Sequence, residues 1–169
     1  MKPESYFAEC ALRYEECFFA GGDVDENALR DLLKRLVDLL GAGLKLTAQA
    51  DVDFNVDADE ICEERLALAR RRASRIPIGM YWDALQPVDL NEDRLVVGDI
   101  QDDLIDILIG VARSSRLYSS GCRREAVWHW REDMQSHWAA HAVSAAKILT
   151  AHLCSRAQLI GAPLSSETE

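Results

Sequence analysis

The sequence predicts an all-α protein, a bundle of about five helices with one long C-terminal helix. The first observation is a stretch at 122–158 that lacks glycine and proline and carries apolar residues at helical spacing. The second is that shorter segments upstream repeat this spacing. The third is size, because 169 residues with 49% hydrophobic content suit one core. We therefore predict a single helical domain at 1–160 and a flexible tail at 161–169.

Four shorter helices are predicted ahead of the long one, at 4–20, 26–40, 58–75 and 99–119. In each of them, apolar residues recur every three or four positions, which places them on one helix face. Glycines or a proline stand near the ends of these segments, where a helix is expected to stop. The connector at 77–98 holds aromatic residues but too few apolar residues for a sheet, so we expect it to be irregular.

Composition excludes several classes of function. The net charge of −10 argues against nucleic acid or an anionic membrane as a partner, because both attract basic surfaces. No apolar run is long enough for a membrane span, and the first residues lack the apolar core of a signal peptide. We therefore expect a cytoplasmic protein. The five cysteines form no C-x-x-C pair, which favours free thiols over a zinc knuckle or disulfides.

An aspartate cluster opens the fourth predicted helix. Asp99, Asp102, Asp103 and Asp106 fall within an arc of about 100° on the side opposite the main apolar face. Clustered carboxylates can hold Mg²⁺ or Mn²⁺. Alternatively, Asp99 is an N-cap, and the next two acids complement the helix dipole in the first turn. Only Asp106 lies beyond that second explanation.

The long helix carries histidines at metal-binding spacing. Asp133, His137 and His141 follow one another at intervals of four, and two histidines so spaced can share one metal ion. The H-E-x-x-H motif is absent, and histidines beside an apolar stripe also serve as packing residues. Because the fourth and fifth helices should pack antiparallel, the acids and histidines could meet. The candidate metal ligands are therefore Asp102, Asp103, Asp106, His137 and His141.

Two further groups are candidate surfaces. Arg70, Arg71 and Arg72 form a basic cluster that suits a phosphate or another anion, although cations also complement a helix C-terminus. The tryptophans of the long helix are candidates for an interaction surface: Trp128, Trp130 and Trp138.

Two stretches resemble a known family. Asp102-Asp103-Leu104-Ile105-Asp106-Ile107 is followed by Val127-Trp128-His129-Trp130 and then His137-Trp138-Ala139-Ala140-His141. This succession resembles a bacterial family of small all-helical proteins, catalogued as a domain of unknown function. The resemblance is clearest over 81–150. It implies the fold, and it carries no activity with it.

Two functions remain open, and the sequence does not decide whether the protein is an enzyme. The first is a non-enzymatic bundle without a cofactor, which binds a protein partner or forms a homo-oligomer. The second is a metal-dependent hydrolase of a phosphorylated small molecule. In that hydrolase the aspartates would hold a divalent metal, His137 or His141 would be a ligand or general base, and the arginines would bind phosphate.

Overall fold

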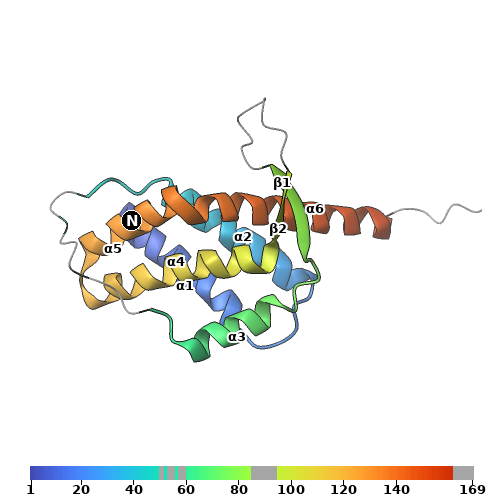
Figure 1. Ribbon diagram of the computed structural model, residues 1–169, viewed down its shortest axis with the longest axis horizontal. Coiled ribbons are helices and arrows are strands. Elements are labelled where there is room, and N and C mark those ends of the chain that lie inside the picture. The colour runs from blue at the N-terminus through green and yellow to red at the C-terminus, as the bar shows by residue number, and fades with distance from the viewer. Residues whose placement is uncertain (50–51, 53–55, 57–59, 85–94, 162–169) are drawn as a thin grey trace, which may run out of the picture.

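Helices dominate the computed structural model, which describes residues 1–49, 52, 56, 60–84 and 95–161, the last six of them without side chains. The elements follow in this order: α1 (Pro3–Phe19), α2 (Glu26–Gly43), α3 (Glu63–Ala73), β1 (Met80–Ala84), β2 (Leu95–Asp99), α4 (Ile100–Ser120), α5 (Arg123–Asp133), η1 (Met134–Trp138) and α6 (Ala139–Gly161). The segments α5, η1 and α6 run on as one long helix beside α4 (Figure 1). The predicted all-α class is confirmed.

Local chemistry sets the helix ends. The Asp25 carboxylate accepts the Ala28 N–H at 2.8 Å, and the Asp99 carboxylate accepts the Gln101 N–H at 2.9 Å, so both are N-caps. Gly121 ends α4 with φ at +100°, a conformation that favours glycine. The third helix begins at Glu63, later than predicted, since Cys62 has extended backbone angles. Part of its predicted first turn, at 57–59, lies outside the described residues.

The long helix contains a π-helical turn, η1, which the sequence analysis did not predict. Trp130, Met134, Trp138 and Ala142 are all buried, at a spacing of four. Over twelve residues, a regular α-helix would turn this row by about 120° away from the core. The Ala139 N–H instead bonds to the Met134 carbonyl five residues earlier. This wider turn keeps all four side chains on the buried face.

The core lies where α1, α4 and the long helix meet. The Phe7 ring lies 4.7 Å from the Trp130 ring and 6.3 Å from the Trp138 ring, measured between centroids. The Trp130 Nε1–H donates to the Val111 carbonyl at 3.1 Å. The Tyr14 hydroxyl donates to the Leu104 carbonyl at 2.9 Å. Both tryptophans are therefore core residues, held by aromatic packing and, for Trp130, a buried hydrogen bond.

The connector contains a β-hairpin, so our expectation of an irregular segment at 77–98 was wrong. β1 and β2 pair antiparallel, with Tyr81 opposite Gly98 and Trp82 opposite Val97. The two strands are separated in sequence, so the short apolar run at 95–97 did not indicate that it pairs with β1. Tyr81 and Asp83 point toward the helices, whereas the alternate residues of β1 are exposed.

Two expectations concern the chain as a whole. The flexible tail was predicted at 161–169; Gly161 is the last residue of α6, and 162–169 lie outside the described residues. Within the part of the chain that the structure describes, no helix is both long and apolar enough to cross a membrane.

Candidate metal centre

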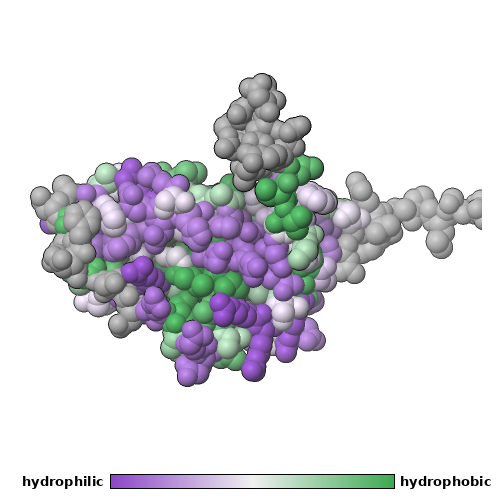
Figure 2. Space-filling model, viewed as in Figure 1, coloured by the Kyte–Doolittle hydropathy of each residue, from purple (hydrophilic) through white to green (hydrophobic). Residues whose placement is uncertain are grey.

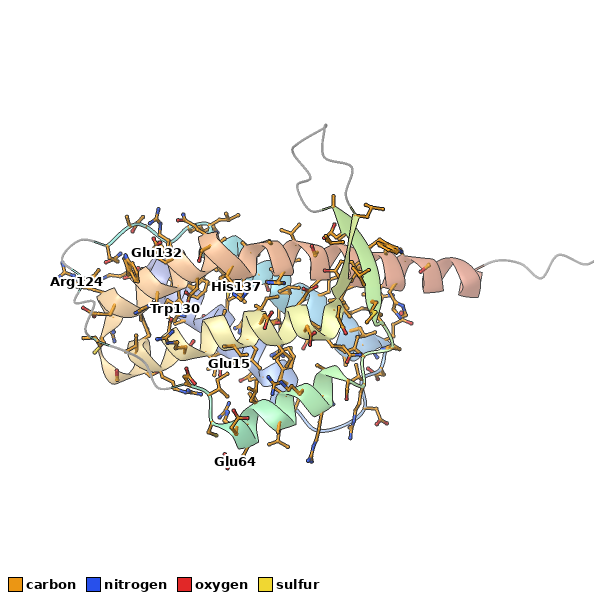
Figure 3. All side chains as sticks on the ribbon, in the orientation of Figure 1. Glu15, Glu64, Arg124, Trp130, Glu132 and His137 are labelled. Carbon is orange, nitrogen blue, oxygen red and sulfur yellow. The ribbon has the colours of Figure 1, made fainter. Side chains whose placement is uncertain are left out.

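The antiparallel packing of α4 against the long helix brings four of the predicted site residues together. Asp103 and Asp106 come from the first two turns of α4, His137 from η1 and His141 from the start of α6. Figure 3 places His137 between the ribbons of the long helix and α4. One ligand atom each from Asp106, His137 and His141 can be chosen so that all three lie within 4.8 Å of one another.

Asp103 orients the His141 ring. Oδ1 of Asp103 lies 2.7 Å from Nδ1 of His141, and the Asp103 side chain is only 9% exposed. The Tyr81 hydroxyl donates to the other oxygen of the same carboxylate. With the Nδ1 proton held by Asp103, the Nε2 lone pair of a neutral imidazole is free. This arrangement of carboxylate, histidine and metal recurs in zinc sites, where the carboxylate fixes the ring and its tautomer.

The remaining separations are close to those of a metal site. Nε2 of His141 lies 3.9 Å from Oδ2 of Asp106. Tetrahedral zinc with ligand bonds of about 2.0–2.2 Å holds neighbouring ligand atoms about 3.4 Å apart. Small side-chain rotations would therefore close the site around an ion. Asp106 is 42% exposed and His137 is exposed, so water or a substrate can reach the remaining coordination positions.

Tyr81 is a phenol donor that the sequence analysis did not assign to the site. Burial, followed by the hydrogen bond to Asp103, raises the pKa of Tyr81, so it keeps its proton at neutral pH. Asp83, two residues later, accepts from Ser144 and from Lys147, the latter at 2.8 Å. These bonds lower the pKa of Asp83 and tie the hairpin to α6. Side chains alternate between the two faces of a strand, so the spacing of Tyr81 and Asp83 could have indicated that both lie on the same face of β1.

The other acids play smaller parts. Asp102 is exposed and lies outside the described group of metal-ligating atoms, while Asp99 caps α4. The pKa of Asp133 is raised because the residue is buried, an effect that exceeds the opposing influence of its neighbours His129, Arg113 and His137. Three of the five predicted ligands thus lie close enough together to share one ion, and Asp103 is hydrogen-bonded to one of them.

The predicted surfaces lie elsewhere. Trp130 and Trp138 are fully buried, so this structure does not present them to a partner, and Trp128 is half-buried. Arg70 and Arg71 are exposed on α3 and Arg72 is half-buried. Because α4 lies between α3 and the long helix, these arginines do not approach the histidines (Figure 1).

The family follows from the comparison with family models. A model described as DUF5063, a domain of unknown function, matches residues 16–155. The chain belongs to this family. The match covers both motif stretches and confirms the family resemblance predicted from them. The DUF5063 description names no activity, and no curated protein matches the chain significantly.

A solved structure supports the fold. The crystal structure of protein BF1032 from Bacteroides fragilis matches with a TM-score of 0.72 over 97% of this chain and 96% of that chain. The two sequences are 15% identical, so the similarity concerns the fold. The DUF5063 chain therefore shares its whole architecture with an experimentally determined protein.

Gly98 leaves room for the Tyr81 ring, and this gives a prediction. A Cβ at residue 98 would lie 2.4 Å from the Tyr81 ring and 2.7 Å from its hydroxyl oxygen. We expect Gly98→Ala to push the Tyr81 hydroxyl away from Asp103 and to weaken Zn²⁺ binding at this candidate site by about 10-fold, as Tyr81→Phe should. Isothermal titration calorimetry checks this. The matched control is Gly79→Ala, where a Cβ meets nothing within 4 Å. Equal affinities for Gly98→Ala and wild type would show that Tyr81 does not support the site.

Proposed function

We propose that this DUF5063 protein is a metal-dependent hydrolase that binds one divalent transition-metal ion. Asp106, His137 and His141 hold the ion. The observation that carries this proposal is the hydrogen bond from His141 to the buried Asp103, which aims the other ring nitrogen at Asp106. Two nitrogen ligands and one oxygen ligand favour zinc or a similar ion over Mg²⁺, which prefers oxygen ligands alone.

The open side of the site supports hydrolysis rather than a purely structural ion. Structural zinc sites are closed by four protein ligands, whereas catalytic sites hold three and leave one position for water. A metal ion here would lower the pKa of its bound water and supply hydroxide near neutral pH. Asp106 and His137 line the exposed side, so water can reach the open position there.

The substrate class that best fits is a phosphorylated small molecule. Arg113 follows Asp106 by two helical turns, so it lies on the same face of α4. Its positive charge acts on Asp133, which also adjoins His137, so this guanidinium group lies in the neighbourhood of the site. A guanidinium group attracts a phosphate ester. In such a hydrolysis one water would be consumed: its oxygen would add to phosphorus as the phosphorus–oxygen ester bond breaks, and its proton would pass to the leaving oxygen to give the alcohol.

Two measurements test this function. Protein freed of metal with EDTA is titrated with Zn²⁺, Mn²⁺ and Mg²⁺ by calorimetry, and we expect one Zn²⁺ per chain with weaker binding of Mg²⁺. The zinc-loaded protein is then assayed with p-nitrophenyl phosphate, with the Asp106→Asn variant as control. Absence of stoichiometric metal would refute the proposal. Stoichiometric metal without hydrolysis of any phosphate ester would leave metal binding and remove the hydrolase.

An interaction module is the second candidate, because the outer face of the hairpin is apolar and exposed. Met80 is 77% exposed, Trp82 66%, Leu95 63% and Val97 55%. Figure 2 shows apolar colouring gathered over the hairpin. No third strand of the described residues pairs with either edge. An exposed apolar strip beside open strand edges is typical of surfaces that bind another chain.

This candidate predicts association through the hairpin. We expect the protein to form a homo-oligomer in solution and Trp82→Glu to return it to the monomer, because a charge opposes burial of that strip. Size-exclusion chromatography with light scattering measures both masses. Leu12→Glu is the control, since Leu12 is 59% exposed but lies on α1. A monomeric wild type at high concentration would exclude the homo-oligomer.

A further inference from the structure

A hollow lies away from the metal centre, between the end of α1, the start of α2 and the end of α3. Its volume is about 490 Å³, within the range of about 300–1,000 Å³ that small-molecule sites occupy. Most of its lining is apolar: Phe18, Phe19, Val24, Ala28, Leu32, Ala73 and Ile76. The thiol of Cys17 also lines it, and burial raises the pKa of Cys17 to about 11, so this group is neutral. The hollow therefore suits an apolar body.

A second hollow of about 330 Å³ adjoins the first and is basic. The two share Phe18, Phe19, Ala20 and Arg72, so they form one continuous surface. The second adds Arg71 and Arg75 at its rim. An apolar cavity thus opens directly onto the arginine cluster at the end of α3. We call the two together the arginine-rimmed hollow.

The guanidinium group in the apolar part, that of Arg35, is already paired with carboxylates. Nε of Arg35 lies 2.8 Å from a carboxylate oxygen of Asp31, and its Nη1 lies 3.1 Å from one of Glu16. These three groups line the first hollow, where two carboxylates face one guanidinium group. The head group of an anionic ligand would therefore find no unmatched cation there.

The charges of the rim are not neutralised within the described chain. Arg72 donates to the backbone carbonyls of Gly22 and Asp23, which carry no net charge. Arg71 and Arg75 make no ion pair with any acid that the structure describes. The α3 C-terminus supplies about half a negative charge, which three guanidinium groups exceed. The net charge of −10 acts less here, because distant carboxylates are screened beyond about 8 Å.

We propose that the arginine-rimmed hollow binds a small anionic amphiphile. The apolar chain of the ligand occupies the space between α1, α2 and α3, and its terminal carboxylate or phosphate lies on Arg71 and Arg75. Guanidinium groups pair such anions through two parallel hydrogen bonds. This site is separate from the proposed metal centre and does not depend on it, since α4 lies between them.

Binding of four probes to the purified full chain tests the proposal. Calorimetry with decanoate, decyl phosphate, decanol and inorganic phosphate separates the contributions of the chain and the head group. We expect one site for decanoate or decyl phosphate. Decanol and inorganic phosphate should bind at least about tenfold more weakly, because decanol lacks the anionic head group and inorganic phosphate lacks the apolar chain. The tighter of the two anionic probes identifies the head group. Absence of binding by both anionic probes would overturn the proposal.

Three variants locate the ligand. The double variant Arg71→Gln, Arg75→Gln should weaken the anionic probe about tenfold or more, whereas Arg70→Gln should not, because Arg70 lies on the same helix but lines neither hollow. Ala28→Leu should weaken it too by filling the cavity. Circular dichroism confirms that each variant is folded. Equal affinity of the double variant and Arg70→Gln, or unchanged affinity of Ala28→Leu, would overturn the proposal.

Discussion

Replacing His141 with alanine is expected to abolish zinc binding at physiological concentrations, with at least about a 100-fold loss of affinity. Removing a residue that only supports a metal ligand costs about 10–100-fold, and His141 is itself a ligand in the proposed site. The substitution also removes the hydrogen-bond partner of the buried Asp103 carboxylate, whose Oδ1 lies 2.7 Å from the imidazole Nδ1. Competition between the protein and a chelating dye measures the affinity.

The control is His129→Ala on the same long helix. His129 is half-buried and does not belong to the described ligand group, so its loss should change zinc affinity less than twofold. His137→Ala should resemble His141→Ala. Asp103→Asn should have an intermediate effect of about 10–100-fold, because the amide can still contact the ring without its charge. Zinc binding that survives both histidine variants would place the metal elsewhere and remove the proposed active site.

Replacing Trp130 with alanine is expected to lower the free energy of unfolding by about 3–5 kcal/mol. The side chain is completely buried, and its ring contacts Phe7 and Tyr118 at centroid distances of 4.7 and 5.2 Å. The substitution opens a cavity among α1, α4 and α5. It also removes the hydrogen bond that Nε1 donates to the Val111 carbonyl. Urea denaturation followed by circular dichroism measures the change.

Two further variants separate packing from the hydrogen bond. Trp130→Phe keeps most of the aromatic packing and should cost less than the alanine variant, since the Val111 carbonyl still accepts from Ser115. Trp82→Ala, at a site 66% exposed, should change the free energy of unfolding by no more than about 0.5 kcal/mol. A Trp130→Ala loss as small as that of Trp82→Ala would contradict the placement of Trp130 in the core.

The helices could be predicted from the sequence because the signals that form them are local. Leu29, Leu32 and Leu36 recur at helical spacing and are buried in α2, and Asp25 and Asp99 stand where N-caps belong. Gly121 separates α4 from the long helix because glycine readily adopts the left-handed backbone conformation that ends a helix, which is also a local property. Each of these residues acts within one or two helical turns, so composition and spacing determine the result.

The hairpin and the π turn could not be predicted in this way. Tyr81 pairs with Gly98 across a long sequence gap, and its hydroxyl reaches Asp103 on a third element. The π turn exists because Trp138 must remain on the face that buries Trp130, a requirement set by the partner helices. Both features depend on contacts that the local sequence does not specify.

The candidate site divides along the same line. Local sequence specifies which residue types are available, namely aspartates on one helix and histidines four apart on another. Tertiary packing buries Asp103 beneath His141, 38 residues away, and turns Asp106 toward the same ring while Asp102 faces solvent. The physical reason is that helix spacing defines a face, whereas the packing of two helices decides what that face meets.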